Sequence, residues 1–238
     1  MALPKLNNDV PKYEFKVPST KEIKKYRPFL VKEQKVLLVA FESKDDKMVL
    51  NSMLDCIKGC VQDFNVYDAP TYDVDYAFLQ VRAKSVGETA KIVHTCSDCN
   101  TENTVSIRID EIGMDVAEKK KEDFEIKIND NITLELQHPN YKDVISNTGN
   151  SNDSETVALF KQITSCLKAV KTDDEYIRFK DEDRKEVETF VDSLTQQQLE
   201  QITQFIQNVP KIKHSQKYEC KKCKNENTLE LEGLQDFF

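Results

Sequence analysis

Hydrophobic and polar residues alternate near the start of the chain and then change to helical spacing. Tyr13, Phe15 and Val17 alternate before the turn residues Pro18-Ser19-Thr20, which predicts a hairpin returning through Ile23 to Phe29. Apolar stripes then predict three helices, carrying Leu30, Leu37, Leu38 and Phe41; Val49, Met53, Ile57 and Val61; and Val74, Phe78 and Val81. Pro70-Thr71 is expected to start the third helix and Gly87 to end it.

The second half follows a similar order after a polar connector at 113–123. Residues alternate on both sides of the Asn129-Asp130-Asn131 turn, which predicts a second hairpin. Later helices are predicted from Val157, Phe160, Ile163, Leu167 and Val170; from Val187, Phe190 and Val191; and from Leu199, Ile202, Phe205 and Ile206. A capping box of Thr195 and Gln198 starts the last helix. The predicted class is therefore α+β, a mainly helical body with β-hairpins.

Two Cys-x-x-Cys pairs provide the candidate chemistry. Cys96/Cys99 and Cys220/Cys223 are each followed by nearly the same run, ending in Glu-Asn-Thr and an alternating segment typical of a strand. Four thiolates suffice for one tetrahedral structural zinc site, so the pattern predicts a zinc-ribbon-like element. Free thiols and redox thiols are the alternatives, but thioredoxin-type chemistry requires the pair at the start of a helix.

The repeated pairs also suggest an internal duplication. Lys91 to His94 leads into the first pair, and Lys211 to His214 precedes the second by a slightly longer spacer. We therefore divide the chain into 1–112 and 113–238, each with a hairpin, helices and one Cys knuckle, joined as one compact unit by a shared zinc. The sequence leaves open a single ribbon with a helical body inserted between its halves, and whether zinc closes within one chain.

Composition narrows the class of protein. With 238 residues, 39% hydrophobic and 32% charged, the chain is long enough for a substantial core. No apolar run is long enough to span a bilayer and no secretion signal is evident, so we expect an intracellular chain without a membrane partner. The other cysteines, including Cys56 and Cys60 one helical turn apart and Cys166, are interpreted as core residues, although Cys56 and Cys60 could ligate a metal.

The net charge of −8 argues against a general nucleic-acid binder. Six lysines crowd the second knuckle, however, so a nucleic-acid-binding zinc ribbon is kept as the alternative function.

Signatures of catalysis are missing from the sequence. There is no nucleophile elbow, phosphate-binding glycine loop or His-Glu-x-x-His pair. His94 and His214 each precede a complete cysteine pair, so we expect them to be neighbours of the ligands or surface residues. A metal held by four thiolates has no open position. We therefore predict a protein that is not an enzyme.

Two segments of the chain are distinctive beside the Cys knuckles, KYRPFLVKEQKVLL at 25–38 and FLQVRAKSVGE at 78–88. Together with the knuckles they resemble the baseplate hub proteins of T4-like contractile-tailed bacteriophages, and the resemblance covers most of the chain. It implies a structural subunit or assembly factor of the tail baseplate hub, with other hub or tail proteins as partners. It also implies assembly in the host cytoplasm, after which the protein either stays in the virion baseplate or leaves it.

Two segments are predicted partner contacts within that interpretation. The first is Arg27-Pro28-Phe29-Leu30, for which the alternative is a plain exit from the hairpin into a helix. The second includes the terminal Phe237 and Phe238, which either dock on a neighbour or fold back onto the chain's own core.

Overall fold

The computed structural model describes residues 10–114, 116, 120–147 and 155–237. The chain divides into two compact units, one of Met1–Val66, Tyr72–Asp115 and Lys211–Phe238, the other of Tyr67–Thr71 and Val116–Pro210. Helices and small antiparallel sheets occur together, so the predicted α+β class is confirmed. None of the helices in the described ranges combines the length and the apolar character needed to cross a membrane.

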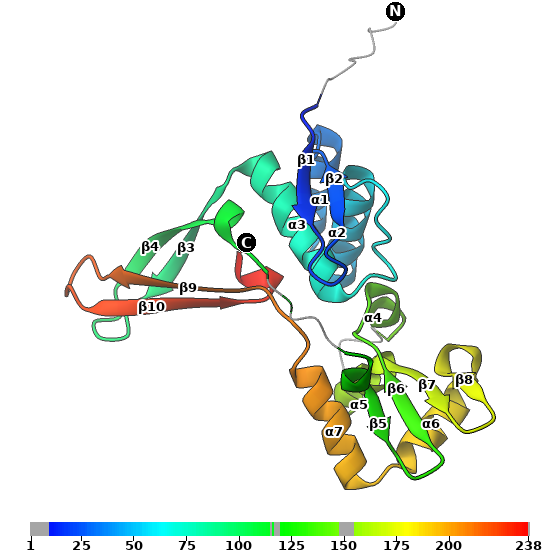
Figure 1. The fold of residues 1–238 in the computed structure, drawn as a ribbon. Helices are drawn as coiled ribbons and strands as arrows, with labels where there is room; N and C mark the ends of the chain where they lie inside the picture. Colours follow the sequence, from blue (N-terminus) through cyan, green and yellow to red (C-terminus); the bar gives the residue numbers. More distant parts are fainter. Residues whose placement is uncertain (1–9, 115, 117–119, 148–154, 238) are drawn as a thin grey trace, which may run out of the picture. The chain divides into compact units, whose positions relative to one another are not determined.

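A hairpin and helices open the first unit (Figure 1). β1 (Tyr13–Lys16) pairs antiparallel with β2 (Ile23–Tyr26), as the alternation predicted. The helices that follow are α1 (Val31–Ser43), α2 (Asp46–Cys60) and α3 (Thr71–Val86). Asp45 caps α2, because its carboxylate accepts the backbone N–H groups of Lys47 and Met48 at 2.9 and 3.1 Å.

The buried side of α1 differs from the predicted one. Leu37 and Ala40 are buried, whereas Leu38 and Phe41 are 54% and 48% exposed. The helix packs against α2. Because apolar residues occur almost all round this helix, their spacing could not indicate which side would be covered.

Two hairpins of equal length complete the first unit (Figure 1). β3 (Thr89–Thr95) pairs with β4 (Glu102–Arg108), and β9 (Lys213–Glu219) pairs with β10 (Glu226–Glu232), both antiparallel. β4 and β10 alternate exposed and buried residues in the same order. Their buried residues join α3 and the C-terminal segment in one core, formed by Leu79, Ala83, Ala90, Val105, Ile107, Ile109, Ile112, Ile212, Leu229, Leu231 and Phe237.

The second unit contains a four-stranded antiparallel sheet and helices (Figure 1). The strand order is β5 (Glu125–Lys127), β6 (Thr133–Leu136), β7 (Leu167–Lys171) and β8 (Tyr176–Arg178). The helices are α4 (Tyr141–Asn147), α5 (Glu155–Cys166), α6 (Arg184–Asp192) and α7 (Gln196–Gln207). Buried side chains of the sheet and of α5, α6 and α7 form a separate core, and Cys166 belongs to it as predicted.

Local signals in this unit gave both a confirmed and a wrong prediction. The capping box is confirmed, since the Gln198 side chain accepts the Thr195 N–H at 2.8 Å and Thr195 Oγ1 accepts the Gln198 N–H at 3.4 Å. The helix predicted through Val170 instead ends at Cys166. Leu167 begins β7, which pairs with both β6 and β8, so ladder hydrogen bonds replace the last helical turn.

A buried carboxylate in β6 forms hydrogen bonds and ion pairs with side chains of β7 and β8. Glu135 in β6 is 8% exposed and accepts hydrogen bonds from Lys168 at 2.7 Å and from the Tyr176 hydroxyl at 3.2 Å. The ammonium group of Lys171 also lies 2.7 Å away. Burial opposes the charge on Glu135, but the hydrogen bonds from Lys168 and Lys171 prevail and lower its pKa to about 2.

The compact units do not coincide with the predicted halves 1–112 and 113–238. Residues 211–238 belong with the first unit, so both Cys hairpins lie in one unit, and most of the second unit falls between them in sequence. This arrangement corresponds to the single ribbon with an inserted body that the sequence left open. A duplication of the two halves stays a prediction about the origin of the chain.

Candidate metal centre

The turn between β3 and β4 is a compact knuckle. The Cys96 N–H donates to the Thr101 carbonyl at 3.0 Å, and the Cys96 carbonyl accepts the Asn100 N–H at 3.1 Å. Asn100 has a φ of +54°, a left-handed conformation that asparagine adopts more readily than most residues. The turn therefore brings the Cys99 side chain back beside that of Cys96.

The turn between β9 and β10 repeats this geometry. The Cys220 N–H donates to the Asn225 carbonyl at 2.9 Å, its carbonyl accepts the Lys224 N–H at 3.1 Å, and Lys224 has a φ of +63°. Each element of this hairpin lies 124 residues after its counterpart, the same separation as that between His94 and Tyr218. The predicted repeat of the cysteine pairs and following strands thus has a structural counterpart.

The upstream part of the predicted repeat is out of register. His94 matched His214 in sequence, but in the paired hairpins its counterpart is Tyr218. His94 Nδ1 and the Tyr218 hydroxyl lie 2.7 Å apart, with the rings edge to face at 5.6 Å. His214 Nε2 lies 3.5 Å from Gln216 Oε1. Neither histidine belongs to the cluster of potential ligands described next.

The four cysteines of the knuckles lie together. Their sulfur atoms are all within 4.8 Å of one another, and the pairs Cys96–Cys223 and Cys99–Cys220 are 3.6 Å apart. A disulfide requires about 2.05 Å. Four sulfurs at 2.3 Å from a zinc ion would be about 3.8 Å apart, close to the distances observed. Among the described residues this is the one group of at least three potential ligands that could hold a metal ion.

Backbone groups favour the thiolate form of the first cysteine in each knuckle. The N–H groups of Cys223 and Lys222 donate to the Cys220 sulfur and lower the pKa of its thiol to about 6. Those of Cys99 and Asp98 lower the pKa of Cys96 in the same way. Because metal ligation requires thiolate, these N–H groups suit the cluster to a metal ion.

A pair of buried asparagines connects the two knuckles by hydrogen bonds. Asn227 reaches from β10 to the first knuckle, where its Oδ1 accepts the Ser97 N–H at 3.0 Å and hydroxyl at 3.1 Å. Its Nδ2 donates to the Cys96 sulfur at 3.4 Å and to the Asn225 carbonyl at 3.0 Å. Asn227 is only 5% exposed.

Asn103 makes the equivalent contacts in the opposite direction. Its Oδ1 accepts the Lys221 N–H at 2.9 Å, and its Nδ2 donates to the Cys220 sulfur at 3.5 Å and to the Thr101 carbonyl at 2.8 Å. Neither asparagine was predicted from the sequence to belong to the site. The signal was present in the repeated Glu-Asn-Thr, but only the fold shows that each asparagine serves the other knuckle.

The C-terminal segment closes the core beneath the hairpins. Phe237 is 1% exposed and packs in the core of the first unit, so its side chain is not available to another protein in this structure. Phe238, the other predicted contact of this segment, lies outside the described residues. The Asp236 carboxylate accepts the Glu232 N–H at 2.8 Å, which anchors the segment to the end of β10.

The Arg27 to Leu30 segment joins β2 to α1 through internal contacts. Arg27 donates to Glu33 at 2.8 Å and to the carbonyls of Pro28 and Gly59 at 2.9 Å. The Leu30 N–H donates to the same Glu33 carboxylate at 2.8 Å, which caps α1. The segment is half-buried, and these hydrogen bonds connect the end of the hairpin to the start of α1.

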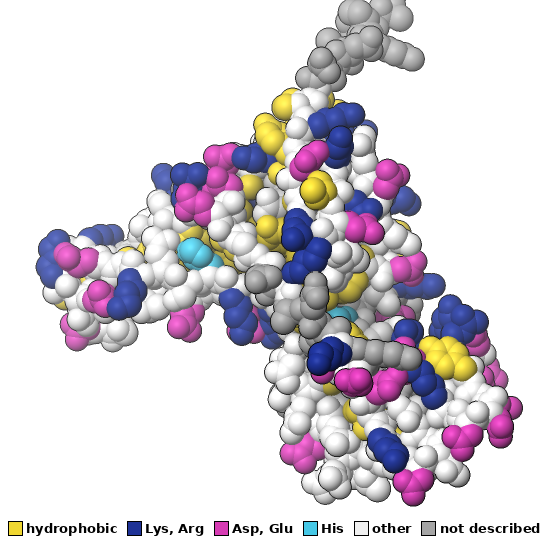
Figure 2. Space-filling view, in the orientation of Figure 1, with side chains coloured by type: hydrophobic (Ala, Val, Ile, Leu, Met, Phe, Trp, Pro, Cys, Tyr) yellow, Lys and Arg dark blue, Asp and Glu magenta, His cyan; other side chains and the backbone are white. Residues whose placement is uncertain are grey.

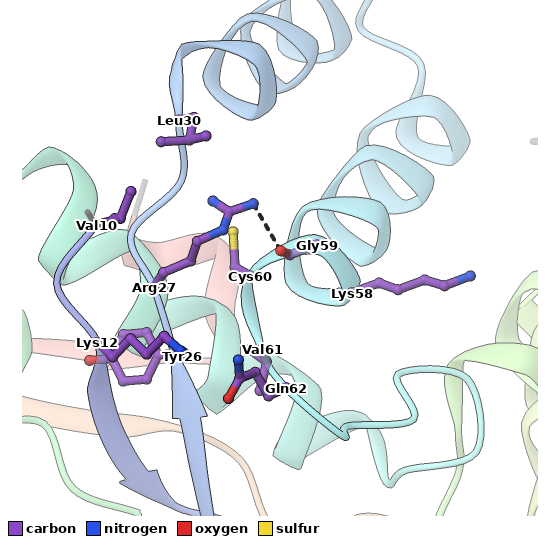
Figure 3. Close-up of a pocket in the computed structure, with 10 residues that line it drawn as sticks. All are labelled: Val10, Lys12, Tyr26, Arg27, Leu30, Lys58, Gly59, Cys60, Val61 and Gln62. Carbon is purple, nitrogen blue, oxygen red and sulfur yellow. Dashed lines mark hydrogen bonds between the residues drawn. The ribbon is translucent and has the colours of Figure 1, made fainter. Parts of the chain in front are cut away.

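The same segment borders a pocket of about 520 Å³ (Figure 3). Lys12, Arg27 and Lys58 are among its lining residues, which include no carboxylate. Figure 3 shows the Arg27 guanidinium close to the sulfur of Cys60. A hydrogen bond from Cys56 lowers the pKa of the Cys60 thiol against the effect of burial. Both thiols are buried, as the core interpretation of these cysteines predicted.

Four of the six lysines near the second knuckle form ion pairs with glutamates. Lys211 and Lys217 each lie 2.8 Å from a glutamate carboxylate, Lys224 lies 3.2 Å from one and Lys213 lies 3.4 Å from one. Figure 2 shows basic and acidic side chains interspersed over the viewed face. A nucleic-acid interface needs concentrated positive charge, so these ion pairs disfavour the alternative function of a nucleic-acid-binding zinc ribbon.

The fold and the cysteine cluster define a class of α+β protein in which the turns of two hairpins bring four cysteines together. Comparison with protein families places the chain more closely. Residues 10–238 match the family described as T4 bacteriophage base plate protein, and the chain belongs to this family. No match was found among curated proteins or among solved structures.

Membership of this family makes the protein a phage baseplate component whose partners are other phage tail proteins. It supports a structural role. The predicted resemblance to a phage baseplate protein is confirmed by this match, whereas the hub in particular is not tested by it.

Proposed function

We propose that the protein is a non-enzymatic structural or assembly component of the baseplate hub, acting by holding protein-binding surfaces in a fixed geometry. The family match over residues 10–238 carries the proposal. The resemblance of 25–38 and 78–88 to hub proteins supports the hub in particular. On this proposal the protein assembles in the host cytoplasm and then either stays in the virion baseplate or leaves it.

The scaffold is tied by one structural zinc ion held by Cys96, Cys99, Cys220 and Cys223. Support comes from sulfur separations of 3.6 Å, close to the edge of a zinc–thiolate tetrahedron, and from the N–H groups that favour thiolate. With four protein ligands the ion would have no open coordination position. Its role would be to join segments of chain that lie 124 residues apart.

The pocket beside Arg27 is a partner contact for an acidic side chain of another tail protein. Its lining offers three cations and no carboxylate, and Arg27 is held in place by Glu33 and two backbone carbonyls. Pro28, Phe29 and Leu30 would add apolar contact area at its edge. Substituting Lys12 by Glu should then weaken partner binding without changing the melting temperature.

The hub role is tested in phage-infected cells. We expect the protein to co-sediment with hub precursors, and we expect loss of the protein to stop hub assembly while the rest of the baseplate still forms. Co-sedimentation with another part of the baseplate only, or normal hubs without the protein, would contradict the hub role. It would leave the family assignment intact.

Closure of the metal site within one chain is tested by mixing two double variants. One variant carries Cys96→Ser and Cys99→Ser, the other Cys220→Ser and Cys223→Ser. Neither should hold zinc, and a refolded mixture should hold none either. If the mixture regains zinc, the site is formed between two chains.

A further inference from the structure

α1 exposes more large apolar side chains than any other element in the described residues. Val31, Val36, Leu38, Val39 and Phe41 are all between 47% and 79% exposed. Single exposed apolar residues are common, but five on one helix indicate an interaction surface.

The spacing of three of these residues fits packing along another helix. Leu38 and Phe41 follow Val31 by seven and ten positions, so the three residues lie on one stripe of the helix. Gln34 lies on the same stripe, between Val31 and Leu38. Leu37 and Ala40, which face α2, lie on a different side of the helix. The stripe is therefore not part of the chain's own core.

The charges of α1 are arranged so that the helix complements itself. Lys32 and Lys35 lie in its first half, and Glu42 lies in its last turn. The remaining charged residue, Glu33, lies 2.8 Å from Arg27 and 3.3 Å from Lys32 of its own chain. A second α1 running antiparallel would bring its acidic end to this basic end, with the two helix dipoles also opposed.

We propose that α1 forms the interface with α1 of a second copy of this chain, antiparallel about a twofold axis. Such a contact places Val31 near the partner's Phe41 and Lys35 near the partner's Glu42. In a twofold interface each α1 must supply the apolar stripe, the basic residues and the acidic residue, and α1 carries all three. A different partner protein would not require α1 to carry both signs of charge. This interface is independent of the hub role, because it concerns the purified chain alone.

Sedimentation velocity of the full-length protein across a wide range of concentration tests the interface. We expect a reversible dimer, and Leu38→Glu should raise its dissociation constant by roughly tenfold or more. Val93→Glu is the matched control, because Val93 is an exposed apolar residue of β3, 61% exposed, and should leave the dimer unchanged. Circular dichroism verifies that each variant is folded.

Charge reversal tests the antiparallel arrangement. Lys35→Glu and Glu42→Lys should each weaken the dimer, and the double variant should restore it, because the pair is re-formed with opposite signs. A monomer at all concentrations would overturn the proposal, as would a dimer insensitive to Leu38→Glu. A dimer weakened by Leu38→Glu but not restored in the double variant would overturn the antiparallel orientation.

Discussion

Replacing Asn227 by alanine should destabilise the first unit, because this side chain connects the two knuckles. The variant loses three conventional hydrogen bonds, two from Ser97 and one to the Asn225 carbonyl, and a weaker one to the Cys96 sulfur. Each is worth about 1 kcal/mol net. Ser97 and Asn225 are exposed, so water can replace the lost partners and no large additional penalty is expected. We expect a loss of about 2 to 3 kcal/mol.

The assay is urea unfolding of the metal-loaded protein, combined with metal affinity by competition with a chelator. Metal affinity should fall roughly 10- to 100-fold, as is usual when a group that orients a metal ligand is removed. Asn103→Ala should give effects of similar size, because the contacts of the two asparagines are reciprocal. Thr228→Ala is the control, since Thr228 is the exposed neighbour on β10 and should change stability by less than about 0.5 kcal/mol.

Two results would contradict this role of the asparagines. If Asn227→Ala were no more destabilising than Thr228→Ala, the side chain would not connect the knuckles. If Asn227→Ala were destabilising but Asn103→Ala were not, the reciprocal arrangement would be wrong.

Three further predictions concern other parts of the chain. The folded pKa of Glu135 is about 2, below its ordinary 4.5, so its ion cluster stabilises the fold above pH 4.5 and the contribution is lost as pH falls toward 2. Glu135→Gln should flatten this acid limb in urea unfolding across pH, and an unchanged limb would contradict the assignment. Arg27→Ala should lower the unfolding free energy by about 2 kcal/mol in urea, because Glu33 and two carbonyls lose a donor; no change would show that these bonds form only weakly. Phe237→Ala should lower it by about 3 to 5 kcal/mol, since the ring is fully buried, and a loss below about 1 kcal/mol would place the ring outside the core.

Elements with local signals could be predicted from the sequence. The β5–β6 hairpin is specified by alternation on both sides of a turn, and α7 by the cap at Thr195. The four cysteines could be grouped because their spacing is that of metal knuckles. In each case the residues that carry the signal are close together in the chain, so no knowledge of tertiary packing was needed.

Features that depend on tertiary packing could not be predicted. Leu167 and Val170 continue the apolar stripe of α5, and they would also suit a strand. They form the strand β7 and not a further helical turn because this segment pairs with β6 and β8. Asn103 and Asn227 occur in a visible repeat, but their function depends on each crossing to the opposite knuckle. α1 is apolar on several sides, so the side that packs on α2 was not specified by spacing.

Elemental analysis of the purified protein, with thiols counted before and after chelation, tests whether a zinc ion joins the two knuckles. We expect one zinc ion per chain, released together with four protected thiols and absent from Cys96→Ser and from Cys220→Ser. Protein that is folded without metal, that holds iron in place of zinc, or that has its knuckle cysteines in disulfides would contradict the zinc-tied ribbon.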